Sequence, residues 1–284
     1  MKKANIVILA GQSNAVGVGH VEYLPRHFSP EKVEEYVKGY ETVRINFYSH
    51  GLRSGGFVPT AVGCTERAKV TLGPEVGMAE RYAETHPEGD VFIVKCAVGA
   101  TAMWRDWLSP RSGAPYDADA YCDQVEDVLW AIDHGQPLRA GWCYNELIKL
   151  LGESIALLEQ EGYTPRIRGF CWMQGEADAD TDANVSAYEA RYDNLLADVA
   201  EVFAPYMEEF TSVDAGISAV WIKHAELNAV KEAYAASAPN RVFIPTIAHG
   251  LTTEHEPEGA PDLYHYDSDS VIKLGHLFAE ALPL

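Results

Sequence analysis

The sequence predicts an α/β fold, a three-layer α/β/α sandwich in which helices cover both faces of a mostly parallel sheet. Apolar strand-like runs recur along the chain, amphipathic helical stretches alternate with them, and polar motifs containing glycine follow two of the runs. This alternation is typical of parallel sheets, whose functional loops lie outside the carboxyl ends of the strands.

Six runs of apolar and β-branched residues predict strands that are buried on both faces. They cover residues 5–10, 43–48, 91–98, 167–173, 216–222 and 242–247. Apolar residues at helical spacing predict helices over 147–158, 188–203 and 271–282. We expect one domain over residues 1–284, with long loops at about 51–72 and 99–137. Ordered loops of that length are usually functional.

The composition is that of a globular protein with a strong negative charge. A formal net charge of −20 repels phosphate backbones and anionic membranes, so we expect neither nucleic acid nor a membrane as partner. No apolar run approaches the roughly 18 residues of a membrane helix. The apolar stretch at residues 6–10 is too short for a signal peptide. The expected location is cytoplasmic, or secreted if a preceding signal has been removed.

The cysteines suggest neither a disulfide framework nor a metal site. They stand at positions 64, 96, 122, 143 and 171 without a CxxC pair, and no HExxH spacing occurs. We therefore predict no metal and no cofactor.

The first candidate motif is Gly11-Gln12-Ser13-Asn14, directly after the first predicted strand. Small residues in a turn at a strand's end let a serine hydroxyl project into the crevice, with backbone N–H groups pointing to the same place. Taken alone, the motif fits equally well a plain turn in which Ser or Asn caps a helix.

The second candidate motif is Trp172-Met173-Gln174-Gly175-Glu176-Ala177-Asp178, at the end of another predicted strand. The side-chain amide of Gln174 is able to donate an N–H to a developing oxyanion. The alternative is a loop whose polar groups only hold the backbone, and Glu176 suits that role.

The third candidate motif is Asp262-Leu263-Tyr264-His265, before the last predicted helix. An Asp and a His at this spacing in a turn share a hydrogen bond that fixes the imidazole tautomer and stabilises its protonated form. The spacing also occurs by chance, so the motif gains weight only beside the other two. His249 and His255 lie nearby, but neither has an Asp three residues before it.

Together these segments resemble the SGNH hydrolases, which have a flavodoxin-like sandwich, and within them carbohydrate esterase family 6 and the sialate O-acetylesterase-like (SASA) domains. The likeness spans nearly the whole chain. Two positions depart from the family pattern: Ala100 follows Gly99 where a second glycine is usual, and Tyr266 follows His265 where proline is usual. The matching residues are GQSN at 11–14, GPE at 73–75, VGAT at 98–101 with Trp104 after it, WMQGEAD at 172–178 and DLYH at 262–265.

The resemblance implies a serine esterase that removes O-acetyl groups from carbohydrates through an acyl-enzyme. It implies Ser13 as the nucleophile, His265 as the base and Asp262 as the residue that orients the base. The oxyanion would be held by the N–H of Ser13, a backbone N–H at Gly99 and the side chain of Gln174. For substrate binding we expect the residues Gln12, Asn14, Trp104, Glu176 and Tyr264.

The substrate stays open at this stage. An acetylated neutral polysaccharide such as xylan suits the acidic surface, whereas Arg26, Arg53 or Arg105 offers a carboxylate clamp for sialic acid. Six aromatic residues either stack on sugar rings or pack their loops onto the core. They are Trp104, Trp107, Tyr116 and Tyr121 in the second long loop, and Tyr264 and Tyr266 on either side of His265.

Two other classes of function also fit the sequence. One is a carbohydrate-binding or adhesion domain that keeps the fold without turnover, and the other is an acyltransferase that uses a sugar hydroxyl in place of water.

Overall fold

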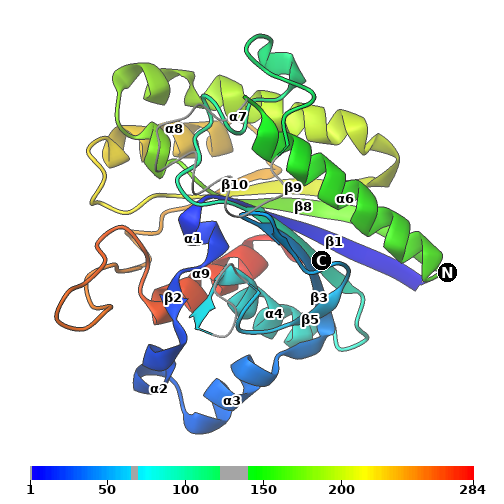
Figure 1. Cartoon of the computed structure of the whole chain (residues 1–284), viewed down its shortest axis with the longest axis vertical. Coiled ribbons are helices and arrows are strands. Elements are labelled where there is room, and N and C mark those ends of the chain that lie inside the picture. Colours follow the sequence, from blue (N-terminus) through cyan, green and yellow to red (C-terminus); the bar gives the residue numbers. More distant parts are fainter. Residues whose placement is uncertain (1, 65–69, 122–139) are drawn as a thin grey trace.

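The computed structural model describes residues 2–64, 70–121 and 140–284, and this part of the chain forms a main sheet with helices on both faces (Figure 1). The strands are β1 (Lys2–Gly11), β2 (Gly19–His20), β3 (Tyr40–Ser49), β4 (Leu52–Arg53), β5 (Val58–Thr60), β6 (Thr71–Leu72), β7 (Val91–Ala97), β8 (Tyr163–Met173), β9 (Met207–Ala215) and β10 (Arg241–Ile244). The helices are α1 (Ser13–Val16), α2 (Leu24–His27), α3 (Pro30–Lys38), α4 (Pro74–Thr85), α6 (Trp142–Gln160), α7 (Asp182–Val202), α8 (His224–Ala236) and α9 (Ser268–Ala281).

The main sheet has the strand order β10-β9-β8-β1-β7-β3-β4 among the described residues, and β5 also pairs with β3. The pairs β1–β7, β1–β8, β8–β9, β9–β10 and β3–β7 are parallel, whereas β4 and β5 run antiparallel to β3. Helices α6, α7 and α8 lie on one face, and α4 and α9 pack together on the other (Figure 1). The three-layer, mostly parallel sandwich predicted from the sequence is thus confirmed.

The predicted strands agree with the structure except at one place. Residues 216–222 were expected to form a strand, but that prediction is wrong: β9 ends at Ala215, and the apolar residues that follow belong to a loop. Strand β9 is only half buried over its first residues, so it carries the polar residues Glu208, Glu209 and Thr211 and lacks the apolar signature of a central strand. In the loop, by contrast, Ile222 is 84% exposed.

The long loops contain short ordered elements. The first holds β4, β5 and β6, and its residues 65–69 lie outside the described residues. The second holds a 3₁₀ turn at Pro110–Ser112, and its residues 122–137, which include Cys122, also lie outside them. The other four cysteines are buried free thiols. In the described part of the chain, none of the helices combines the length and apolar character needed to cross a membrane.

Strands β1 and β8 lie close together where β1 ends. Gly11 has a φ of +141°, and a Cβ atom there would lie 1.9 Å from the carbonyl oxygen of Met173. The next residue, Gln12, donates its backbone N–H to that same oxygen over 3.0 Å. Only glycine fits this conformation and this contact, and the chain can therefore turn sharply into Ser13.

A fully buried ion pair ties the turn after β1 to strand β7. The ammonium of Lys95, which is 0% exposed, donates to the carboxylate of Glu75 over 2.7 Å and to the carbonyl oxygens of Val16 and Cys64 over 2.7 and 3.0 Å. Burial raises the pKa of Glu75, and Lys95 opposes this effect. All three ammonium hydrogens are used, as a buried cation requires.

Replacing Lys95 should strongly destabilise the fold. In Lys95→Met the carboxylate of Glu75 and two carbonyl groups lose their donor in a dry interior, so we expect the free energy of unfolding to fall by about 3–5 kcal/mol. Urea denaturation measures this change in the free energy of unfolding. The double variant Lys95→Met/Glu75→Leu should recover part of the loss, because no unpaired carboxylate remains. A single variant as stable as the wild type would contradict this role of the pair.

Candidate active site

Three predicted site segments meet at the carboxyl ends of neighbouring strands. Ser13 follows β1 as the first residue of α1, Gly99 lies just after β7, and Gln174 lies just after β8. A Cβ atom added to Gly99 would lie 3.6 Å from the Cβ of Ser13. The parallel register therefore gathers these segments at one edge of the sheet, where open α/β sheets bind their ligands.

Asn14 joins the serine turn to the 262–265 turn. Its Nδ2 donates to the carbonyl oxygen of Tyr264 over 3.3 Å and to Glu176 Oε1 over 2.8 Å, and its Oδ1 accepts the backbone N–H of Tyr266 over 3.0 Å. Tyr264 and Tyr266 are the two neighbours of His265. The side chain of the residue after Ser13 thus holds the backbone on both sides of His265.

Asp262 and His265 form the hydrogen-bonded pair that their spacing predicts. His265 Nδ1 lies 2.6 Å from Asp262 Oδ2, and Asp262 Oδ1 accepts the backbone N–H of Tyr264 over 3.1 Å. Burial raises the pKa of Asp262, but the hydrogen bonds from His265 and Tyr264 outweigh it, and the net pKa lies below its usual value. A carboxylate bound to Nδ1 keeps the proton on that nitrogen and leaves Nε2 as an acceptor.

A second histidine, His50, belongs to none of the predicted motifs and lies beside Gly99. The backbone N–H of Gly99 donates to His50 Nε2 over 3.1 Å, and His50 Nδ1 lies 3.1 Å from Ser49 Oγ. Because Nε2 accepts, the hydrogen bonds assign the proton to Nδ1. The Gly99 N–H that was predicted to hold the oxyanion is therefore occupied by an imidazole in this structure.

Gln174 is buried, and its amide is engaged within the protein. Its Nε2 donates to Asp178 Oδ2 over 2.7 Å and to the carbonyl oxygen of Thr101 over 3.0 Å, and it lies 3.3 Å from Gln12 Oε1. Its Oε1 accepts from the hydroxyl of Tyr188 over 3.0 Å. As observed, Gln174 binds three loops together, and direct donation to an oxyanion would require one of these hydrogen bonds to break.

The residues Gln12, Asn14 and Glu176, predicted to bind substrate, are 2%, 0% and 1% exposed. Gln12 Oε1 also accepts the backbone N–H of Ala177 over 3.2 Å. Burial raises the pKa of Glu176, whereas its hydrogen bond from Asn14 lowers it. Their hydrogen bonds connect the serine turn with the loop after β8, whereas Glu176 Oε2 has no hydrogen-bond partner among the described residues.

Asp178 fixes the loop after β7 to the loop after β8. Its Oδ2 accepts the backbone N–H of Met103 over 2.8 Å as well as the amide of Gln174. Burial raises its pKa to about 6 in spite of these hydrogen bonds.

A second buried ion pair supports the loop after β8. Lys231 donates to Asp214 over 2.8 Å, and its ammonium also donates to the carbonyl oxygens of Gln174 and Ala215.

The aromatic candidates divide into exposed and buried side chains. Trp104 and Tyr264 are 41% and 53% exposed, and the Tyr264 ring packs against Trp221 with 5.2 Å between ring centres. Trp107 and Tyr266 are buried in the core. Of these four, Trp104 and Tyr264 are accessible to a sugar.

The three arginines considered as clamps for sialic acid are each paired with a protein carboxylate. Arg26 lies 2.7 Å from Glu258 and Arg105 lies 2.8 Å from Asp106, and Arg53 is bonded to the buried Glu146. An anionic sugar would have to compete with these carboxylates.

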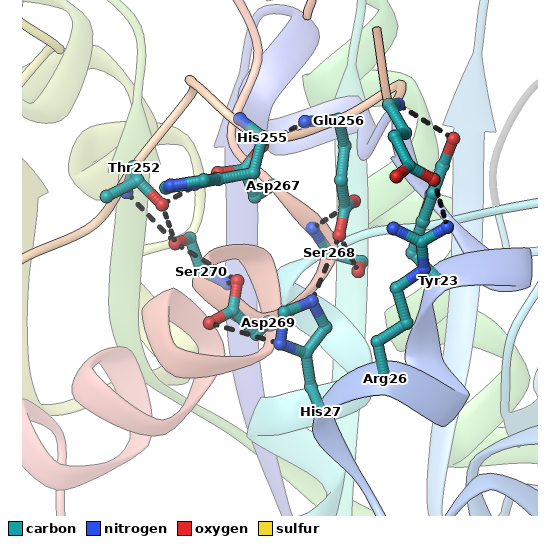
Figure 2. A network of polar contacts seen from close by, with 11 residues as sticks. Tyr23, Arg26, His27, Thr252, His255, Glu256, Asp267, Ser268, Asp269 and Ser270 are labelled. Carbon is teal, nitrogen blue, oxygen red and sulfur yellow. Dashed lines mark hydrogen bonds and ion pairs between the residues drawn. The ribbon is translucent and has the colours of Figure 1, made fainter.

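A polar network supports the loop that leads to the 262–265 turn (Figure 2). Asp267, at the start of α9, accepts from Thr252 Oγ1 over 2.7 Å, from the backbone N–H groups of His255 and Glu256, and lies 2.8 Å from His255 Nδ1. His255 and Asp267 thus form a second His–Asp pair. The contact of Asn14 with both neighbours of His265 distinguishes the first pair as the one beside Ser13.

Glu256 extends this network to helix α2 and to the 262–265 turn. Its carboxylate accepts from the backbone N–H and the hydroxyl of Ser268 over 2.7 and 2.8 Å, and lies 3.2 Å from His27 Nε2. Its carbonyl oxygen accepts the backbone N–H of Asp262 over 2.8 Å. This hydrogen bond therefore fixes the backbone position of Asp262.

Residues 2–64, 70–121 and 140–284 contain no cluster of His, Cys, Asp and Glu suited to a metal ion.

The fold is thus a three-layer α/β/α sandwich whose site segments are grouped at the carboxyl ends of parallel strands. The chain belongs to the SASA family, described as carbohydrate esterase, sialic acid-specific acetylesterase, whose model matches residues 3–283.

Solved structures resemble the chain at low sequence identity. A protein from Arabidopsis thaliana is 18% identical with a TM-score of 0.60 and covers 98% of this chain and 97% of its own. NanS is 14% identical with a TM-score of 0.63, and the match covers 99% of this chain and 96% of NanS. A carbohydrate acetylesterase from Xanthomonas citri is 15% identical with a TM-score of 0.57, and the match covers 98% of this chain but 55% of that one. At these identities the likeness shows the fold. Among curated proteins, no match was found.

The pKa of Asp178 predicts a pH dependence of stability. Because burial raises this pKa from 3.8 to about 6, the folded state binds more protons than the unfolded state between those values. The contribution of Asp178 to the free energy of unfolding therefore falls by about 3 kcal/mol as the pH rises from about 4 to about 6. Asp178→Asn keeps an acceptor oxygen but does not titrate. Urea denaturation should show the wild type losing this amount relative to Asp178→Asn over that range, and a constant difference would contradict the assignment.

Proposed function

We propose that the protein is a serine O-acetylesterase acting on acetylated saccharides, with Ser13 as nucleophile, His265 as base and Asp262 as the group that orients His265. The contact of Asn14 with the backbone on both sides of His265 carries this proposal, because it couples the serine turn to the histidine turn. Membership of a carbohydrate esterase family supports the reaction class. The same fold occurs in a carbohydrate acetylesterase from Xanthomonas citri, which is consistent with it.

In the proposed mechanism, His265 Nε2 takes the proton of Ser13 Oγ as that oxygen attacks the carbonyl carbon of the acetyl ester. The imidazolium then returns the proton to the sugar oxygen as the C–O bond breaks, which leaves an acetyl group on Ser13. Water attacks the acyl-enzyme with His265 again as base and releases acetate. Asp262 stabilises the imidazolium in both halves of the reaction.

For the oxyanion we propose the backbone N–H of Ser13 and that of Gly99. The N–H of Ser13 lies in the first turn of a helix, where backbone donors have no partner within the helix. The N–H of Gly99 would exchange His50 Nε2 for the oxyanion as its acceptor. Gln174 then acts by holding Thr101, two residues after Gly99, in place.

Ser13→Ala should abolish ester hydrolysis and keep the fold. The expected loss in kcat on a chromogenic acetate ester is a thousandfold or more, roughly as for other serine triads. Ser154→Ala, which removes a buried hydroxyl in α6, is the matched control and should stay active. A Ser13→Ala variant with most of its activity would refute the nucleophile. Wild-type protein with no rate above buffer would indicate a binding domain, and acetyl transfer to an added sugar would indicate an acyltransferase.

Asn14→Ala should lower kcat by about a hundredfold, because a shift of about 1 Å between reacting groups has that effect. It should also reduce the free energy of unfolding by about 1–3 kcal/mol, since Glu176 and two backbone groups lose partners. Asn46, a buried asparagine bonded to Ser154 and Ser54, provides the matched control. Asn46→Ala should lose similar stability and retain kcat. If kcat is equal in the two variants, Asn14 does not position His265.

A further inference from the structure

A pocket of about 350 Å³ opens beside the 262–265 turn. Leu263, which follows Asp262, forms part of its wall, together with the loops after β9 and β10. Pockets that bind small molecules commonly have volumes of about 300–1,000 Å³. The pocket is therefore large enough for a sugar ring and lies next to the His265 segment.

The lining combines apolar surface with a few polar groups. Val220, Ile247 and Leu263 are 38%, 48% and 47% exposed, so apolar side chains face solvent here. Thr253 and Glu254 add polar groups to the same wall. A pyranose ring has the matching chemistry, because its C–H faces are apolar and its rim carries hydroxyl groups.

The hydroxyl of Ser218 gives independent support for a polar ligand. Ser218 lines the pocket and is 6% exposed, and its Oγ has no hydrogen-bond partner in the described residues. Buried polar atoms are normally satisfied, so an unpaired hydroxyl at a pocket wall points to a partner that binds there. A sugar hydroxyl is able to supply both a donor and an acceptor.

Hydrogen bonds to neighbouring elements hold the walls of this pocket in place. Thr252, which lines it, donates to Asp267 in the network of Figure 2, and that network also fixes the backbone of His255. On the other side, Thr246 Oγ1 and the hydroxyl of Tyr266 both donate to the carbonyl oxygen of Gly216, over 2.9 and 3.2 Å. A preformed pocket loses less entropy when a ligand binds.

We propose that this pocket binds a second, neutral sugar unit of an acetylated oligosaccharide whose acetylated unit lies at Ser13. The inference rests on the proposed function. Tyr264 lies between Leu263 of the pocket and His265, and its exposed ring provides a surface along which the saccharide passes from one to the other. The carboxylate of Glu254 repels an anionic sugar. The site therefore favours a neutral oligosaccharide over sialic acid.

Filling the pocket tests the subsite. Val220→Trp should lower kcat/KM for acetylated xylobiose at least tenfold relative to kcat/KM for a chromogenic acetate ester, mainly through KM. Ile222→Trp is the control, since Ile222 is 84% exposed and lies outside the lining, and it should keep the wild-type ratio. Melting curves verify that both variants fold. An unchanged ratio in Val220→Trp overturns the subsite alone, whereas wild-type protein inactive on every ester overturns the proposed function and the subsite with it.

A charge variant tests the preference for neutral sugars. The wild type should cleave acetylated xylobiose with a higher kcat/KM than O-acetyl sialic acid. In Glu254→Gln the ratio of these two kcat/KM values should fall by about threefold at low ionic strength, which is the size expected for one exposed charge. The difference between Glu254→Gln and the wild type should become smaller as salt is added. A wild-type preference for O-acetyl sialic acid, or a preference that Glu254→Gln leaves unchanged, would overturn the neutral assignment.

Discussion

The geometry of the site depends on two lysine ammonium groups that are buried in the interior, those of Lys95 and Lys231. A buried cation is tolerated only when each of its hydrogens meets an acceptor and a carboxylate lies nearby. Lys95 meets this demand partly with the carbonyl oxygen of Val16, at the end of the serine turn, and Lys231 partly with that of Gln174. The two loops that carry the predicted chemistry are thus bound to buried ammonium groups, and neither loop can move without leaving a lysine hydrogen unpaired.

Much of the fold could be predicted because the central strands are buried on both faces and hence continuously apolar. Strand β9 could not, because its first half is partly exposed and polar, while the loop after it contains the apolar residues of a pocket wall. The same cause produced both the wrong strand at residues 216–222 and the failure to expect a pocket there. Apolar residues that line a pocket have the same sequence signal as a strand.

The site was predictable where its partners are close in sequence. The hydrogen bond between Asp262 and His265 follows from their spacing, whereas the contacts of Asn14 and the contact of Gln174 with Thr101 join residues more than 70 positions apart. No local pattern encodes such contacts. Lys95 did leave a signal, a lysine within the apolar run VFIVKCA, but Lys231 and His50 lie in ordinary helical and strand-end sequence.

The contact of Gly11 with Met173 bears on how relatives of this protein are recognised. Gly11 is required by the approach of two strands, and Asn14 by the backbone around His265, whether or not any ester is cleaved. Descendants that lost turnover would therefore retain most of the GQSN signature as a consequence of packing. Under the proposed mechanism, the hydroxyl of Ser13 is the one group of the motif that would distinguish an enzyme from a protein that has kept only the architecture.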